Sequence, residues 1–138
     1  MNREIKDIVI HCTGGSQDAT PENIQKYWRR KGWKHDGYHY IIDYLGKLTC
    51  LEPPQHPSNG VRHYNKHSLN IAWIGGKYED NRTAMQIRTL ANTIRVLRAM
   101  YPDAEIKGHR DFPKVAKSCP RFDVADFIEE MDLDNNDF

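Results

Sequence analysis

A loop near the C-terminus carries the side chains best suited to chemistry. Residues 108–120 read GHRDFPKVAKSCP, which puts His109 and Cys119 in a stretch without helical or strand periodicity. Imidazole and thiolate are ligand types that Zn²⁺ prefers, and a catalytic zinc needs three protein ligands with a fourth position open. The best candidate for the third ligand is His11, which follows the apolar run at residues 8–10. The end of a strand would hold this imidazole rigidly.

This set of ligands, together with nearby polar residues, indicates amide hydrolysis. Zn²⁺ held by two imidazoles and one thiolate lowers the pKa of a bound water to about 7 and polarises a carbonyl oxygen. A cation would stabilise the oxyanion that forms on the attacked carbonyl. Lys117 is a candidate for that cation, and Lys114 is the alternative. A phenol could hold or deprotonate the attacking water, or hydrogen-bond the oxyanion, and Tyr38 and Tyr40 are candidates for it.

The elements that must position these residues alternate between strands and helices. Apolar or β-branched runs predict strands at residues 5–11, 38–43, 47–52, 69–74 and 104–107. Helices are predicted after the capping residues Thr20, Thr83 and Asp123. Thr83 and Gln86 also form a capping-box pattern, which makes the middle helix the clearest one in the chain.

Length and composition suit one domain. The 138 residues are 38% hydrophobic, enough to bury a core without disulfide or metal staples. A metal here would therefore serve chemistry rather than folding. The order of elements predicts a single α/β domain over residues 1–138, with a central mixed β-sheet of about five strands flanked by about three helices. We expect the core at about residues 5–131 and a flexible acidic tail at 132–138.

The charge pattern bears on possible partners. The chain has 20 basic and 19 acidic residues, a net charge of +1, and no long block of either sign, which disfavours nucleic-acid binding. No apolar run reaches the roughly 18 residues of a membrane span, and the N-terminus lacks the apolar segment of a signal peptide. We therefore expect synthesis in the cytoplasm and no stable membrane association. The solvated face of a helix is the simplest interpretation of Lys26, Arg29, Arg30 and Lys31.

Two residues beside the candidate site residues are expected to point away from the site. Side chains alternate between the two faces of a strand, so Cys12 should lie opposite His11, and His39 opposite Tyr38. We expect Cys12 in the core and His39 either packed or exposed. The chain has three cysteines and no CxxC spacing, which fits reduced thiols rather than a disulfide framework.

Six short motifs occur in a fixed order along the chain. They are IVIHC at 8–12, GW at 32–33 followed by GYHYII at 37–42, YN at 64–65 ahead of Ser68, IGG at 74–76, GHRD at 108–111 and KSCPRFD at 117–123. Together they resemble the zinc-dependent N-acetylmuramoyl-L-alanine amidases of the phage endolysin and peptidoglycan-recognition-protein superfamily. The resemblance extends over about residues 8–127, nearly the whole chain.

The resemblance implies a ligand set, catalytic residues and a substrate. One Zn²⁺ ion would be bound by His11, His109 and Cys119, while Tyr38 and Lys117 match the catalytic tyrosine and lysine of the family. The substrate would be peptidoglycan, cut at the amide between N-acetylmuramic acid and L-alanine. We expect a monomer that acts on the cell wall after release from the cell, as phage endolysins do.

Two alternatives remain open from the sequence. His63 and Asn65 are candidate substrate contacts, but their loop is shorter than the one common in the family, and His63 could equally be a surface histidine. A non-catalytic peptidoglycan-binding module is the alternative function. Such binders of the family typically lose the thiolate ligand, and the presence of Cys119 therefore favours the enzyme.

Overall fold

The computed structural model describes residues 3–115 and 117–133 as one α/β domain. Its sheet has five strands in the order β3-β2-β4-β1-β5. All neighbouring strands are parallel except β2 and β3, which are antiparallel. The strands are β1 (Asp7–Cys12), β2 (Tyr40–Ile42), β3 (Leu48–Cys50), β4 (Ser68–Trp73) and β5 (Glu105–Gly108). The predicted mixed sheet of about five strands is thus confirmed.

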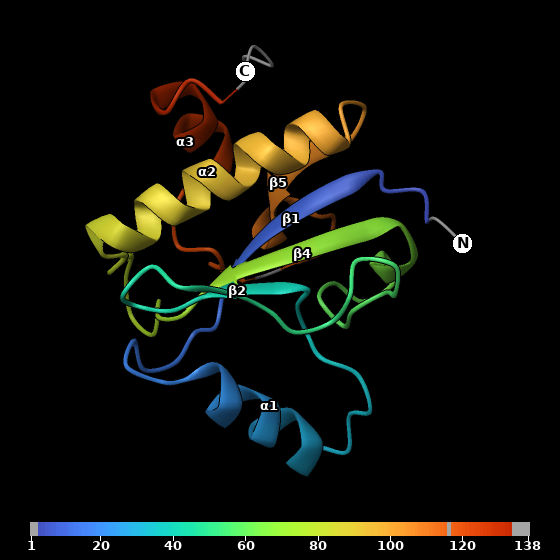
Figure 1. Ribbon diagram of the computed structural model, residues 1–138, viewed down its shortest axis with the longest axis vertical. Coiled ribbons are helices and arrows are strands. Elements are labelled where there is room, and N and C mark those ends of the chain that lie inside the picture. Colours follow the sequence, from blue (N-terminus) through green and yellow to red (C-terminus); the bar gives the residue numbers. More distant parts are fainter. Residues whose placement is uncertain (1–2, 116, 134–138) are drawn as a thin grey trace.

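Three helices cover the two faces of this sheet. Figure 1 shows α2 (Ala84–Met100) and α3 (Val124–Glu130) on one face and α1 (Pro21–Arg30) on the other. The larger core cluster lies between the sheet and the α2/α3 layer, where Ile10 and Ile71 of neighbouring strands contact α2 residues such as Ile94. Each such side chain contributes roughly 1.5–3 kcal/mol by leaving water. These central strands are buried on both faces, which explains their continuous apolar runs.

The strand boundaries differ from the predicted ones in a way that matters for the site. β1 continues through Cys12, so His11 lies within the strand rather than at its last position. β2 begins at Tyr40, and Tyr38 therefore precedes the strand that was predicted to contain it. The apolar run alone cannot show this, because a strand begins where a neighbouring strand accepts its hydrogen bonds.

The helix caps follow the sequence closely. The Thr83 hydroxyl accepts a hydrogen bond from the Gln86 N–H at 3.1 Å, and the Gln86 side chain accepts one from the Thr83 N–H at 3.0 Å. Thr20 forms the equivalent cap on α1 with Asn23. Asp123 caps α3 by accepting from the Asp126 N–H. These contacts satisfy backbone donors that a helix N-terminus otherwise leaves unpaired.

Replacing Thr83 by alanine should lower the free energy of unfolding by about 1 kcal/mol. The hydroxyl also donates to the Tyr44 carbonyl at 2.8 Å. The variant therefore loses a hydrogen bond to the β2–β3 turn as well as the cap. Urea unfolding followed by circular dichroism measures the change. Arg88→Ala, at an exposed position on the same helix, is the control and should change stability by less than about 0.5 kcal/mol. Equal stability of the two variants would contradict the role of the cap.

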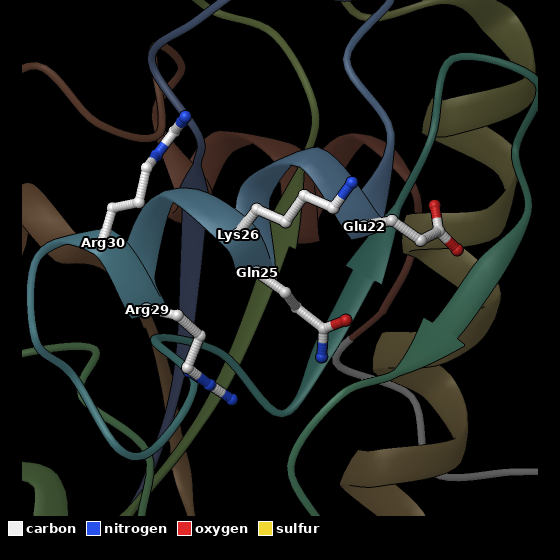
Figure 2. A pocket seen from close by; sticks show the side chains of 5 residues that line it. All are labelled: Glu22, Gln25, Lys26, Arg29 and Arg30. Atoms are coloured by element: carbon white, nitrogen blue, oxygen red, sulfur yellow. The ribbon is translucent and has the colours of Figure 1, made fainter.

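The basic cluster of α1 is solvated, as predicted. Figure 2 shows a shallow surface hollow of this helix lined by Glu22, Gln25, Lys26, Arg29 and Arg30. Arg29 also forms an ion pair with the buried carboxylate of Asp36, with 2.7 Å between Nη2 and Oδ1. The hollow contains none of the candidate ligands. It is therefore a feature of the helix surface rather than part of the site.

The C-terminal segment is partly packed. Leu133, which the sequence placed in the flexible tail, is fully buried and belongs to the core cluster under α2 and α3. The rest of the predicted tail, residues 134–138, lies outside the described residues. Within residues 3–133, position 116 aside, no helix has both the length and the apolar character needed to cross a membrane.

Candidate metal centre

The fold brings the three candidate ligands together at one edge of the sheet. The ligand atoms of His11, His109 and Cys119 all lie within 4.8 Å of one another. β1 and β5 are neighbouring parallel strands, with Ile10 opposite Gly108. The residues that follow this pair, His11 and His109, therefore lie side by side, with ring centroids 4.9 Å apart.

Backbone contacts hold Cys119 beside the two histidines. The Cys12 N–H donates to the Cys119 sulfur at 3.0 Å, and the Arg110 N–H donates to the Cys119 carbonyl at 3.0 Å. The next residue is fixed as well, because the indole N–H of the buried Trp73 donates to the Pro120 carbonyl at 3.1 Å. The loop that appeared irregular in the sequence is thus anchored at its cysteine and at the residue that follows.

The chemistry of these donors fits a zinc ion. Burial lowers the pKa of His11 to about 3, and burial followed by the charge of Lys117 lowers the pKa of His109. Both imidazoles are consequently neutral at neutral pH, which is the form that binds metals. A hydrogen bond with the Cys12 thiol, together with burial, raises the pKa of Cys119. A thiolate at this position therefore requires a cation beside it, and two imidazoles with one thiolate suit Zn²⁺.

Tyr38 lies next to the ligand cluster. Its ring centroid is 4.9 Å from that of His11, and its hydroxyl donates to the Cys12 carbonyl at 3.4 Å. Burial, and then the neighbouring Cys119, raise the pKa of Tyr38 far above its usual range. The phenol is therefore protonated at neutral pH. This favours a hydrogen-bond donor over a base among the roles considered from the sequence.

Lys117 and Lys114 differ in their relation to the ligands. Both line the same groove and both are exposed. The charge of Lys117 contributes to lowering the pKa of His109, so this positive charge lies close enough to the ligand cluster to act on it. Lys114 is not among the causes of either histidine's pKa shift, and its backbone is in the left-handed region at φ 62°.

The ligands lie in a groove of about 1230 Å³. The charged residues that line it within the described chain are all basic, with no aspartate or glutamate, namely Lys31, Arg62, Lys114, Lys117 and Arg121. Aromatic residues line it as well. At one end, the Lys31 ammonium lies 4.4 Å from the ring centroid of Trp33 and 5.3 Å from that of Tyr27. The groove is thus lined by positive charge and by aromatic side chains.

The two predicted substrate contacts lie in different surroundings. His63 lines the groove, in a left-handed backbone conformation at φ 77° that non-glycine residues seldom adopt. Asn65 is not among the residues that line the groove. Its side-chain oxygen instead accepts a hydrogen bond from the Val61 N–H at 2.8 Å, so it supports the loop that carries His63.

The two residues that were expected to point away from the site are both buried. Cys12 is buried, as expected, and its backbone N–H and carbonyl lie 3.0 Å and 3.6 Å from the Cys119 sulfur. His39 is fully buried and belongs to a polar network that includes Asn70, a residue that none of the sequence motifs contains. The signal for Asn70 was present in the sequence as one amide in the middle of an otherwise apolar strand, since a buried polar group requires a partner.

Comparisons with known proteins agree with this geometry. A model of the family described as N-acetylmuramoyl-L-alanine amidase matches residues 1–122. The endolysin of Escherichia phage T7 is 29% identical over 143 residues, which cover 98% of this chain and 93% of that endolysin.

Solved structures share the whole fold. The endolysin of the Thermus scotoductus bacteriophage Ph2119 superposes with a TM-score of 0.79 at 27% identity, over 95% of this chain and 87% of that one. An endolysin N-acetylmuramoyl-L-alanine amidase from Clostridium intestinale gives a TM-score of 0.83 at 25% identity, over 95% and 86% of the two chains.

Proposed function

Because this chain belongs to the N-acetylmuramoyl-L-alanine amidase family, we propose that it hydrolyses the amide between N-acetylmuramic acid and L-alanine in peptidoglycan. The observation that carries the proposal is the convergence of His11, His109 and Cys119 within 4.8 Å inside the groove. The relatives are phage endolysins, and we extend the proposal to a phage-type endolysin. It would act on the cell wall after release from the cell in which it is made.

The residues around the ligand cluster have separate tasks in this reaction. A Zn²⁺ ion bound by the two histidines and the cysteine would supply Lewis acidity and activate water at neutral pH. Tyr38, as a protonated phenol, donates a hydrogen bond to an oxygen at the reacting centre. Lys117 stabilises the negative charge that develops on the carbonyl oxygen, and a charge-stabilising group aimed at such an oxygen typically accelerates a reaction by about 100-fold or more.

The lining of the groove suits a substrate with a glycan and a peptide arm. Basic side chains without opposing carboxylates favour a stem peptide that carries carboxylate groups. Tyr27 and Trp33 line the groove with the Lys31 ammonium over their rings, which places apolar surface beside a positive charge at this part of the groove. We propose His63 as a substrate contact because it lines the groove. We assign Asn65 the supporting role described above.

A peptidoglycan-binding module without activity is the second candidate. It needs the groove but neither the thiolate nor the groups aimed at the reacting centre. Cys119, Tyr38 and Lys117 all line the groove, and their presence together favours the enzyme.

Incubation of the purified protein with peptidoglycan tests the proposal directly. The reaction is run alone, with a chelator, and with zinc restored after chelation, and the released fragments are identified by mass spectrometry. Free stem peptides beginning with an L-alanine amine, lost with chelator and regained with zinc, are the expected result. Binding to the wall without release would move the assignment to the binding module. Release of fragments cut at any other bond would contradict the proposed amidase.

Tyr38→Phe should lower turnover by about 100-fold, the size of effect found when a donor to a developing oxyanion is removed. The substitution keeps the ring that packs near His11 and removes only the hydroxyl, so zinc content should not change. Tyr78→Phe, at a tyrosine that is 80% exposed, is the matched control and should be fully active. Wild-type turnover in a zinc-loaded Tyr38→Phe enzyme would exclude the hydroxyl from catalysis.

A further inference from the structure

Asn70 occupies an unusual place in the middle of β4. Its side chain is fully buried among apolar neighbours, and both ends of its amide are hydrogen-bonded. The amide oxygen lies 2.8 Å from Nε2 of His11, and the amide nitrogen donates to the Ser58 hydroxyl at 2.8 Å. The sheet pairing puts Asn70 opposite Val9, two residues from His11 on the same face.

The hydrogen bonds continue beyond Ser58 to a second buried histidine. The Ser58 hydroxyl lies 3.2 Å from Nδ1 of His39, and the backbone N–H of Asn70 lies 3.0 Å from the same nitrogen. On the other side of the ring, Nε2 of His39 lies 2.7 Å from the His56 carbonyl. Every side chain in this chain of contacts, from His11 to His39, is at most 1% exposed.

The direction of each hydrogen bond follows from the two backbone groups at the end. A backbone N–H can only donate, so Nδ1 of His39 accepts from Asn70. A neutral ring whose Nδ1 accepts carries its proton on Nε2, which donates to the His56 carbonyl at 2.7 Å. The Arg3 guanidinium lies 3.2 Å from the same Nε2, but it is a donor too and donates to the Ser68 carbonyl at 3.1 Å instead. Burial supports this neutral ring by lowering the pKa of His39 to about 4.

The same reasoning assigns donors and acceptors in the hydrogen bonds between His39 and His11. Because Nδ1 of His39 carries no proton, the Ser58 hydroxyl can only donate toward it, sharing its lone pair with the Asn70 backbone N–H. The Ser58 oxygen then accepts from the amide nitrogen of Asn70. The amide oxygen of Asn70 therefore faces His11 and receives its Nε2–H. The free lone pair of the His11 ring is then on Nδ1.

We infer that Asn70 is the positioning residue for His11, holding its ring as the Nε2–H tautomer with Nδ1 turned toward the metal. The inference rests on the proposed zinc site and goes beyond it by naming the ligand atom and the group that selects it. Partners of this kind fix the tautomer and orientation of a metal-binding histidine before the ion arrives. The ring is thus ordered by the fold rather than by the metal.

The same amide also supports the wall of the groove. Gly60 lines the groove, and a Cβ at this position would overlap the Asn70 amide. One side chain therefore contacts both a metal ligand and the loop that precedes His63. The effect of a substitution at Asn70 is therefore best measured as a change in metal affinity, because the loop at Gly60 supplies no metal ligand.

The experiment measures zinc affinity by competition with a chromophoric chelator, in the absence of peptidoglycan. Asn70→Leu removes the acceptor and should weaken zinc binding by about 10-fold to 100-fold, the usual effect of losing such a partner. Asn70→Asp keeps an oxygen facing His11, although it loses the donor to Ser58, and should bind zinc more tightly than Asn70→Leu. A folded Asn70→Leu protein with wild-type affinity would overturn the inference.

A matched control separates positioning from general loss of a buried amide. Gln86 is also fully buried, and its amide donates to the Ile74 carbonyl at 2.9 Å without contacting a ligand. Gln86→Leu should therefore lower stability and leave the zinc affinity unchanged. Weakening of zinc binding to the same degree in Gln86→Leu and Asn70→Leu would mean that stability, rather than positioning, governs the affinity.

A second measurement needs no variant. Nitrogen chemical shifts of the imidazoles in the wild-type protein should report the Nε2–H tautomer of His11 without zinc, and coordination through Nδ1 after zinc is added. An Nδ1–H tautomer, or coordination through Nε2, would refute the inference even if Asn70→Leu does not fold. If zinc binds in this way but no peptide is released from peptidoglycan, the proposed function fails and the role of Asn70 stands.

Discussion

Cys119→Ser should abolish peptide release from peptidoglycan and weaken zinc binding by at least about 100-fold, the upper end of what loss of a ligand's supporting partner costs. The reason is the ligand atom. A thiolate binds zinc strongly, whereas a serine hydroxyl remains protonated at neutral pH and is a poor ligand. The backbone contacts of the Arg110 N–H and the Pro120 carbonyl do not involve the sulfur, so the loop should keep its course.

The control for this variant is another thiol of the same chain. Cys50 is exposed and does not line the groove, and Cys50→Ser should leave both zinc content and cleavage unchanged. Zinc content is measured by atomic emission after dialysis, and cleavage by mass spectrometry of the released peptides. Full activity of zinc-loaded Cys119→Ser would show that the reaction does not depend on the thiolate.

Lys117→Ala should reduce turnover by about 100-fold to 1000-fold while leaving zinc bound. Its charge lies near the ligand cluster, as its influence on the pKa of His109 indicates, and it is not one of the three candidate ligands. Removing a group that stabilises charge only as it develops lowers kcat rather than substrate affinity. The expected signature is therefore a large loss in kcat with a small change in KM and in zinc content.

Lys114→Ala provides the comparison for Lys117→Ala. Both lysines are exposed and line the same groove, so a general loss of positive charge would affect both variants alike. We expect Lys114→Ala to change KM modestly, because its charge can assist binding of an anionic substrate, and to retain kcat. Equal losses of kcat in the two variants, or full activity of Lys117→Ala, would contradict the assignment of the oxyanion-stabilising role to Lys117.

The local features of this chain could be predicted from the sequence because they depend on neighbouring residues. The caps at Thr20, Thr83 and Asp123 formed as predicted, since a capping side chain bonds to an N–H three residues away. The apolar runs became strands and the alternation of elements indicated the α/β class, which follows from burial and period alone. The three candidate ligands also indicate zinc by residue type alone, because the metal preference of imidazole and thiolate does not depend on the fold.

The distances within the site were decided only by the tertiary structure. His11 and His109 meet because β1 and β5 hydrogen-bond to each other in one register, and no local pattern specifies which strands become neighbours. Tyr38 stays outside β2 because the pairing of that strand with β3 and β4 begins at Tyr40, and the backbone N–H of Cys12 donates to the Cys119 sulfur from a distant part of the chain. Asn70 acquires its partners from three separate segments of the chain. The sequence thus determined which chemical groups are available, whereas non-local hydrogen bonding determined which of them face one another.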